Sequence, residues 1–146
     1  PLGPEDMPMP DEARTQDAAG AEAFVRYYID LINRTSTVMD AEPLLDLSDD
    51  CLDCQRIASR TDERSDASYR YVGGEVTITE VADPLLNDPL AEMGIRVDQA
   101  ALSVVDANGA AVAGEGSEAY FGVAGAATLV WDEERTSWLM RTLAFG

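Results

Sequence analysis

Residues 17–33 leave this chain few ways to fold. Apolar side chains recur there with the three- and four-residue spacing of an α-helix. They are Ala21, Phe24, Val25, Tyr28, Leu31 and Ile32. Tyr27 and Ile29 widen the apolar arc well beyond one stripe, and Glu22, Arg26 and Asp30 mark the solvated side. Because a helix that is apolar over most of its circumference must be enclosed, we expect a curved sheet to surround it.

The rest of the chain predicts two short helices and then strands. Thr35-Ser36-Thr37 is expected to end the first helix. Asp40 can cap a helix over residues 42–47, and Ser48-Asp49-Asp50 can cap another from Cys51 to Arg60, before a polar loop over 61–68. Four strand segments follow, at residues 69–81, 93–105, 118–131 and 138–145, with breaks predicted at Gly73-Gly74 and near Ala100-Ala101. This order favours an α+β fold in which about four antiparallel strands curl around the first helix and the short helices close one end.

The first fifteen residues differ in composition from the remainder. They hold four of the seven prolines and many acidic residues, without an apolar period. Residues 1–15 are therefore interpreted as a tag remnant, Pro1-Leu2-Gly3, followed by a Pro-rich acidic linker, and residues 16–146 as a single α+β domain. The alternative is an extended arm that packs through Met7 and Met9.

Charge excludes several classes of function. The chain has 10 basic and 28 acidic residues, a net charge of −18, and no histidine; all the basic residues are arginine. Such a chain repels phosphate backbones and anionic membrane surfaces, so no nucleic-acid partner is expected. Without histidine or lysine it lacks the Ser-His and Cys-His pairs, the commonest zinc ligand and Schiff-base chemistry. The sequence therefore predicts no catalytic residue, no metal site and no cofactor.

Cys51 and Cys54 form a Cys-x-x-Cys pair that allows three interpretations. A zinc site would need further ligands that this chain lacks as cysteine or histidine. A redox pair would need a stabilised thiolate, which the flanking Asp49, Asp50 and Asp53 oppose. The favoured interpretation is a small structural disulfide at the start of a helix, which is typical of an oxidising compartment.

Two stretches carry a resemblance to a known family. Ala23-Phe24-Val25-Arg26-Tyr27-Tyr28-Ile29-Asp30-Leu31-Ile32-Asn33 and Leu47-Ser48-Asp49-Asp50-Cys51-Leu52-Asp53-Cys54 resemble an uncharacterised family of actinobacterial secreted lipoproteins. The order of helices and strands resembles the cone-shaped nuclear transport factor 2-like (NTF2-like, cystatin-like) fold. The resemblance implies export, an upstream lipidated cysteine that this chain lacks, and an extracytoplasmic domain. It implies no activity and brings no catalytic residues.

Five side chains are pocket or binding candidates. Enzymes of the NTF2-like fold place a carboxylate inside the cone, which suggests Asp30 with Tyr27 or Tyr28; the structural alternative for Asp30 is a solvated helix face. Trp131 and Trp138 flank a turn and either line a ligand pocket or stack across the last hairpin as part of the core.

Three functional hypotheses remain. The favoured one is a non-enzymatic extracytoplasmic module that binds a protein or a small molecule and reaches the membrane only through the anchor. The second is a small cone-fold enzyme or ligand carrier that uses Asp30 and tyrosines in a cavity. The third is a redox protein, which a buried and reduction-resistant cysteine pair would exclude. A homodimer through sheet edges is also compatible with the sequence.

Overall fold

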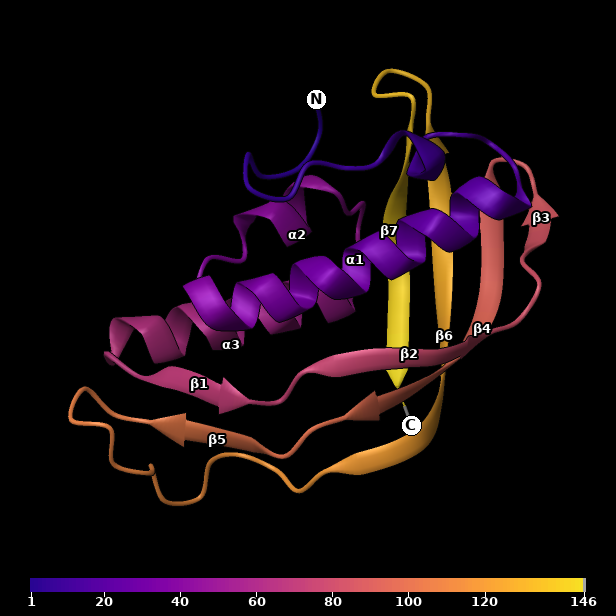
Figure 1. Cartoon of the computed structure of the whole chain (residues 1–146). Coiled ribbons are helices and arrows are strands. Elements are labelled where there is room, and N and C mark those ends of the chain that lie inside the picture. The colour runs from indigo at the N-terminus through magenta and orange to yellow at the C-terminus, as the bar shows by residue number, and fades with distance from the viewer. Residues whose placement is uncertain (146) are drawn as a thin grey trace.

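The computed structural model describes residues 1–145 as helices followed by strands (Figure 1). The helical elements are the 3₁₀ turn η1 (Asp11–Ala13), α1 (Ala18–Val38), α2 (Glu42–Asp46) and α3 (Leu52–Asp66). The strands are β1 (Arg70–Gly73), β2 (Val76–Val81), β3 (Leu85–Asn87), β4 (Leu90–Gln99), β5 (Leu102–Val105), β6 (Tyr120–Asp132) and β7 (Ser137–Phe145). The predicted α+β class is confirmed.

The main sheet has the strand order β2-β4-β6-β7, with β3 beside β4, and every pairing is antiparallel. The breaks predicted at Gly73-Gly74 and Ala100-Ala101 lie opposite each other, where Gly74 N donates to Ala101 O (3.0 Å). Gly73 and Gly74 both have positive φ, which favours glycine. As a result, β1 and β5 leave the main sheet together and form a two-stranded ribbon beneath the C-terminal end of α1 (Figure 1).

The helix α1 is the centre of the hydrophobic core. Phe24, Val25, Tyr28 and Leu31 are at most 1% exposed. They belong to one buried cluster with the inward residues of the sheet, which include Ala91, Met93, Ile95, Val97, Ala127, Leu129, Met140 and Leu143. Inward residues alternate along β4 with exposed ones, as the pleat requires. The arrangement of a helix held in a curved sheet is the one that the NTF2-like resemblance implied.

The prediction that Thr35-Ser36-Thr37 ends the first helix is wrong, because α1 continues to Val38. Each of these hydroxyls donates to the carbonyl four residues earlier; the Thr35 bond to Leu31 O is 2.8 Å. The side chains therefore find partners within the helix instead of competing with it. Met39, the C-cap that follows Val38, adopts the left-handed conformation that ends the helix.

The polar loop predicted at residues 61–68 is also wrong, since α3 extends to Asp66. Thr61 is buried and donates to Ile57 O (2.9 Å). One turn later Arg64 donates to the Tyr71 hydroxyl (2.8 Å) and to Glu115 (3.1 Å). The local bond of Thr61 and the tertiary contacts of Arg64 stabilise a helical extension that the sequence analysis does not predict.

The N-terminal segment packs as an arm and not as a linker, so the alternative interpretation of residues 1–15 holds. Met9 and Ala13 are buried in the core cluster. The Tyr27 hydroxyl donates to Met7 O (2.7 Å), and Arg34 forms a two-pronged ion pair with Asp6. The arm therefore covers the Tyr27 side of α1 by hydrophobic burial and specific polar contacts.

Replacement of the core aromatic Phe24 by alanine tests the enclosure of α1. Because Phe24 is fully buried, we expect Phe24→Ala to lower the free energy of unfolding by about 3–5 kcal/mol in urea titrations. Leu52→Ala is the matched control, since Leu52 is 72% exposed and should change stability by less than about 0.5 kcal/mol. Equal effects of the two variants would contradict the burial of α1.

Candidate functional site

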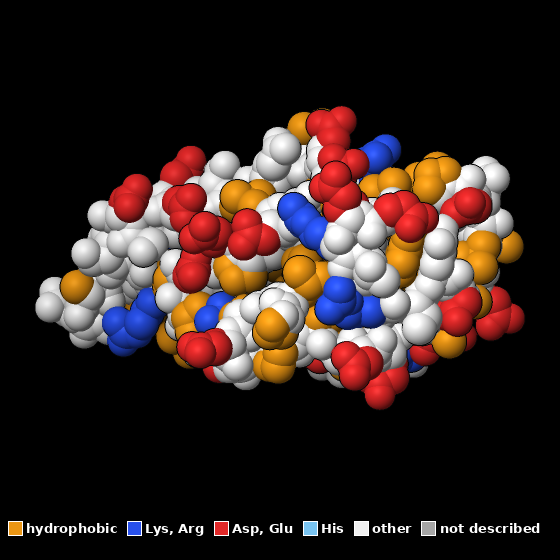
Figure 2. Space-filling model, turned by 90° about the horizontal axis from the view of Figure 1, so that it is seen from above, with side chains coloured by type: hydrophobic (Ala, Val, Ile, Leu, Met, Phe, Trp, Pro, Cys, Tyr) orange, Lys and Arg blue, Asp and Glu red, His pale blue; other side chains and the backbone are white. Residues whose placement is uncertain are grey.

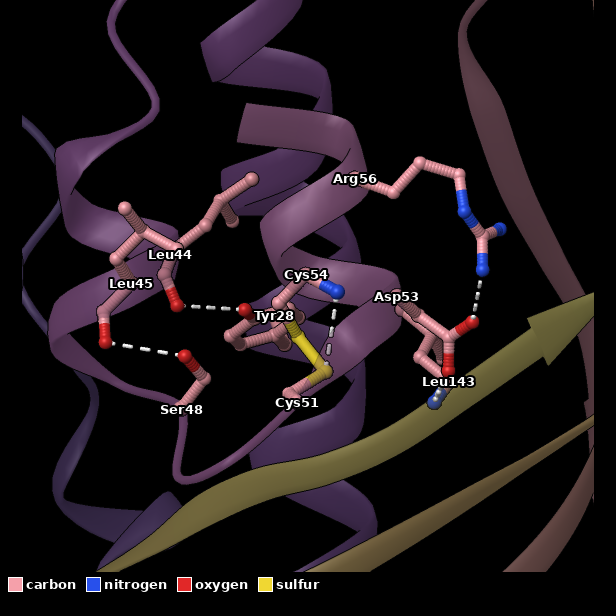
Figure 3. The surroundings of a disulfide bond; sticks show 9 residues. All are labelled: Tyr28, Leu44, Leu45, Ser48, Cys51, Asp53, Cys54, Arg56 and Leu143. Carbon is pink, nitrogen blue, oxygen red and sulfur yellow. Dashed lines mark hydrogen bonds and ion pairs between the residues drawn. A yellow bond between two sulfur atoms is a disulfide. The ribbon is translucent and has the colours of Figure 1, made fainter. Parts of the chain in front are cut away.

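Cys51 and Cys54 form a disulfide at the start of α3 (Figure 3), which confirms the predicted pairing. The two residues are 1% and 0% exposed. Cys51 is also the N-cap of α3, because its Sγ accepts a hydrogen bond from Cys54 N (3.1 Å). We call residues 47–54, which include this bond, the disulfide clamp.

The disulfide clamp closes the free edge of β7. Met140 N donates to Leu47 O and Asp49 N donates to Met140 O, both at 2.9 Å, so the clamp pairs with β7 like a short strand. Further along the edge, Leu143 N donates to Asp53 Oδ2 (3.0 Å), and an ion pair of 2.8 Å joins Arg141 to Asp49. An edge strand with occupied backbone groups cannot easily pair with another chain.

The burial of Cys51 and Cys54 favours a structural role over redox catalysis. A thiol–disulfide exchange partner must bring its thiolate to a sulfur atom, and here both cysteines are enclosed by the core cluster. Tyr28 lies on the inner side of the bond and donates its hydroxyl to Leu44 O (2.7 Å; Figure 3). The clamp thus links α1, α2, α3 and the edge of the sheet.

The structure does not bring Tyr27, Tyr28 and Asp30 together. Tyr28 faces α2 and is fully buried, whereas Tyr27 faces the arm and Asp30 is exposed. A helix turns about 100° per residue, so Asp30 points about 160° away from Tyr28. Burial raises the pKa of both tyrosines, that of Tyr27 to about 12. They are therefore neutral hydrogen-bond donors at physiological pH.

Trp131 and Trp138 lie directly opposite each other on β6 and β7, as the cross-strand interpretation predicted. Their rings meet edge to face, with centroids 5.2 Å apart and planes at 77°. Trp138 is 1% exposed, and its Nε1 donates to Thr15 O (2.9 Å). These contacts attach the segment before α1 to the β6–β7 hairpin, so the two tryptophans have a structural role in packing.

Two polar groups with a structural role escaped the sequence analysis. Asn33 holds Val76 with two hydrogen bonds of 2.8 Å, one from Nδ2 to Val76 O and one from Val76 N to Oδ1. Arg64 packs over the Tyr71 ring at 5.2 Å from its centroid. Asn33 could have been noticed as a lone amide near the end of an apolar helix, but its partner lies 43 residues away.

In the part of the chain that the structure describes, a ligand could bind in clefts at the surface. One cleft of about 390 Å³ lies between α1 and β2 and is lined in part by Asp30, Asn33 and Ile78. Another, of about 370 Å³, lies between the arm, α2 and the β6–β7 turn. Within residues 1–145, no three Asp, Glu or Cys side chains are grouped so that they could hold a metal ion. Nor does this part of the chain contain a helix with the length and hydrophobicity of a membrane span.

Comparison with protein families identifies the family of this chain. The sequence profile of the Family of unknown function (DUF6318) matches residues 5–144. The chain belongs to that family. No curated protein matches the chain at a significant level.

Three solved structures align with the chain at low sequence identity. The crystal structure of the intermembrane space region of the chloroplast protein ARC6 aligns with a TM-score of 0.58 and 14% identity, over 90% of this chain and 97% of that chain. A substituted form of Rd1NTF2 aligns with a TM-score of 0.47 and 13% identity, over 86% and 99% of the two chains. Aln2 from a Streptomyces species gives 0.41 and 14%, over 85% and 89%. The ARC6 likeness shows a common fold.

Removal of the disulfide tests its structural role. We expect Cys51→Ser/Cys54→Ser to fold with a free energy of unfolding lower by at most about 2 kcal/mol, because the bond closes a loop of only four residues. Serine at position 51 keeps an N-cap oxygen, so the variant isolates the cross-link. Faster amide exchange at Leu143 in the variant would show that the clamp loosens. A fully unfolded double variant would contradict this prediction.

The buried tyrosines predict alkaline destabilisation. The unfolded chain loses the tyrosine proton near pH 10, whereas folded Tyr27 keeps it until about pH 12. The native state then binds more protons than the unfolded state, so stability falls as pH rises from about 10 to 12. Urea midpoints should fall over this range, and by less in Tyr27→Phe. Tyr120→Phe, at a half-exposed ring, is the control that should behave like the parent protein.

Proposed function

We propose that this chain is the extracytoplasmic domain of an actinobacterial lipoprotein and that it is a non-enzymatic binding module. An anchor upstream of residue 1 would attach it to the membrane, and the domain would act in the cell envelope. The observation that carries this proposal is the oxidised, buried cysteine pair that closes the sheet edge. Disulfides persist in oxidising compartments and are rare in a reducing cytosol.

Two further observations support the extracytoplasmic location. The resemblance of residues 23–33 and 47–54 to secreted lipoproteins implies export. The ARC6 region that shares the fold lies in an intermembrane space, so the fold is compatible with an environment next to a membrane.

A binding role fits the site chemistry better than catalysis. A general acid or base usually needs a carboxylate or tyrosine placed in a cavity with a partner group. Here the two buried tyrosines donate to backbone carbonyls in different directions, and Asp30 is exposed. Acidic side chains outnumber basic ones over the face shown in Figure 2, which favours partners that carry positive charge.

The kind of partner follows from the surface. The clefts are broad and lie between secondary-structure elements at the surface, so a protein segment fits them better than an enclosed small molecule. A homodimer through β7 is disfavoured because the disulfide clamp occupies that edge. Sedimentation of the purified domain at tens of micromolar distinguishes these partners: we expect a monomer, whereas a concentration-dependent dimer would favour self-association.

The compartment is tested in cells that make the full-length protein. Protease added outside the cells should digest or release the domain while a cytoplasmic control protein stays intact. Acid quenching followed by alkylation should find Cys51 and Cys54 oxidised. A domain that is protected from protease until the cells are lysed, with alkylated thiols, would contradict the proposal.

A further inference from the structure

The strand β2 forms the other edge of the main sheet, and part of its backbone is unpaired. Ala100 N donates to Glu75 O, so the backbone groups of Glu75 point toward β4. Because antiparallel pairing alternates, the groups of Val76 and Ile78 point away from the sheet. Those of Val76 bond to Asn33, whereas within residues 1–145 no hydrogen bond outside the strand ladders involves Ile78.

Asn33 shows how this edge accepts a partner. Its side-chain amide donates to Val76 O and accepts from Val76 N, which is the pair of bonds that a residue of a neighbouring strand would make. The template for an added strand is therefore already in use at Val76 and continues to Ile78. The register shift between Ile78 and Glu80 limits the addition to a short segment.

A cleft adjoins this open edge. α1 lies against β2 where Asn33 bonds to Val76, and the two elements diverge beyond that point (Figure 1). The cleft of about 390 Å³ between them has apolar side chains from Ile29, Val76 and Ile78. Its lining is therefore suited to the alternating side chains of an extended peptide.

The charges of the cleft indicate the chemistry of its partner. Asp30 and Glu75 line it, both are exposed, and neither belongs to an ion pair within residues 1–145. Arg26, the basic residue of the lining, is paired with Glu22 at 3.0 Å. Two free carboxylates beside an open strand edge complement a positively charged side chain.

We propose that the α1–β2 cleft binds a short extended segment of a partner protein that carries Lys or Arg. The segment adds to β2 at Ile78 through its backbone and places its basic side chain against Asp30 and Glu75. This inference rests on the proposed binding function and names its partner class. Backbone bonds supply affinity without sequence preference, and the two carboxylates select the basic segment.

A fluorescent peptide of alternating valine and lysine, capped at both ends, tests the proposal by anisotropy with the whole chain. We expect saturable binding that weakens as salt rises. The double variant Asp30→Asn/Glu75→Gln should weaken it by about three- to tenfold, which lies within the range for the loss of two exposed ion pairs. Asp62→Asn/Glu63→Gln is the matched control, because it removes the same charge from exposed positions on α3. It should change affinity by less than about twofold.

Amide hydrogen exchange assigns the binding site. Saturating peptide should slow exchange at Ile78, and a peptide with N-methylated backbone groups should not. Equal weakening by the two double variants, or unchanged exchange at Ile78, would overturn the proposal. The protease and alkylation tests of the compartment do not involve this cleft. The proposal of peptide binding can therefore be wrong while the proposed extracytoplasmic location stands.

Discussion

Burial of α1 is the interaction on which the rest of this structure depends. A single helix supplies the largest share of the core, and it is covered by the main sheet, by α2 and α3, and by the N-terminal arm over Tyr27. Transfer of this much apolar surface out of water is the main favourable term in folding a chain of this size. The strong bend of the sheet follows, because a flat sheet would leave part of the helix exposed.

A sheet curled around one helix keeps two edges, and the protein treats them differently. The β7 edge is occupied by the disulfide clamp, in which the cysteine pair adds a covalent cross-link to backbone hydrogen bonds and an ion pair that already join this loop to β7. Within residues 1–145, the outer backbone of β2 is occupied at Val76, by Asn33, and the edge then adjoins a cleft lined by Asp30 and Glu75. This asymmetry is the physical basis for placing the binding function at β2.

Local pattern and structure differ most at the element boundaries. Helix and strand types were predictable where a periodic apolar pattern decides them, as in α1 and β4. The ends of α1 and α3 were not, because Thr35 and Thr61 satisfy their hydroxyls within the helix and Arg64 finds partners on β1 and the loop after β5. The packing of the arm has no local signal, because two methionines among prolines give no period, although Met9 is buried in the core.

The sequence by itself determined the α+β class, the apolar helix and the absence of histidine and lysine chemistry, because these depend on composition and on spacing along one segment. It left open the role of the cysteine pair and that of the two tryptophans. Only the tertiary structure decided which way each polar side chain points. Asp30 lies near Tyr27 and Tyr28 in sequence but faces β2, and Asn33 bonds to a residue far along the chain. The reason is that helical rotation and sheet curvature, which no local pattern records, determine which distant groups meet.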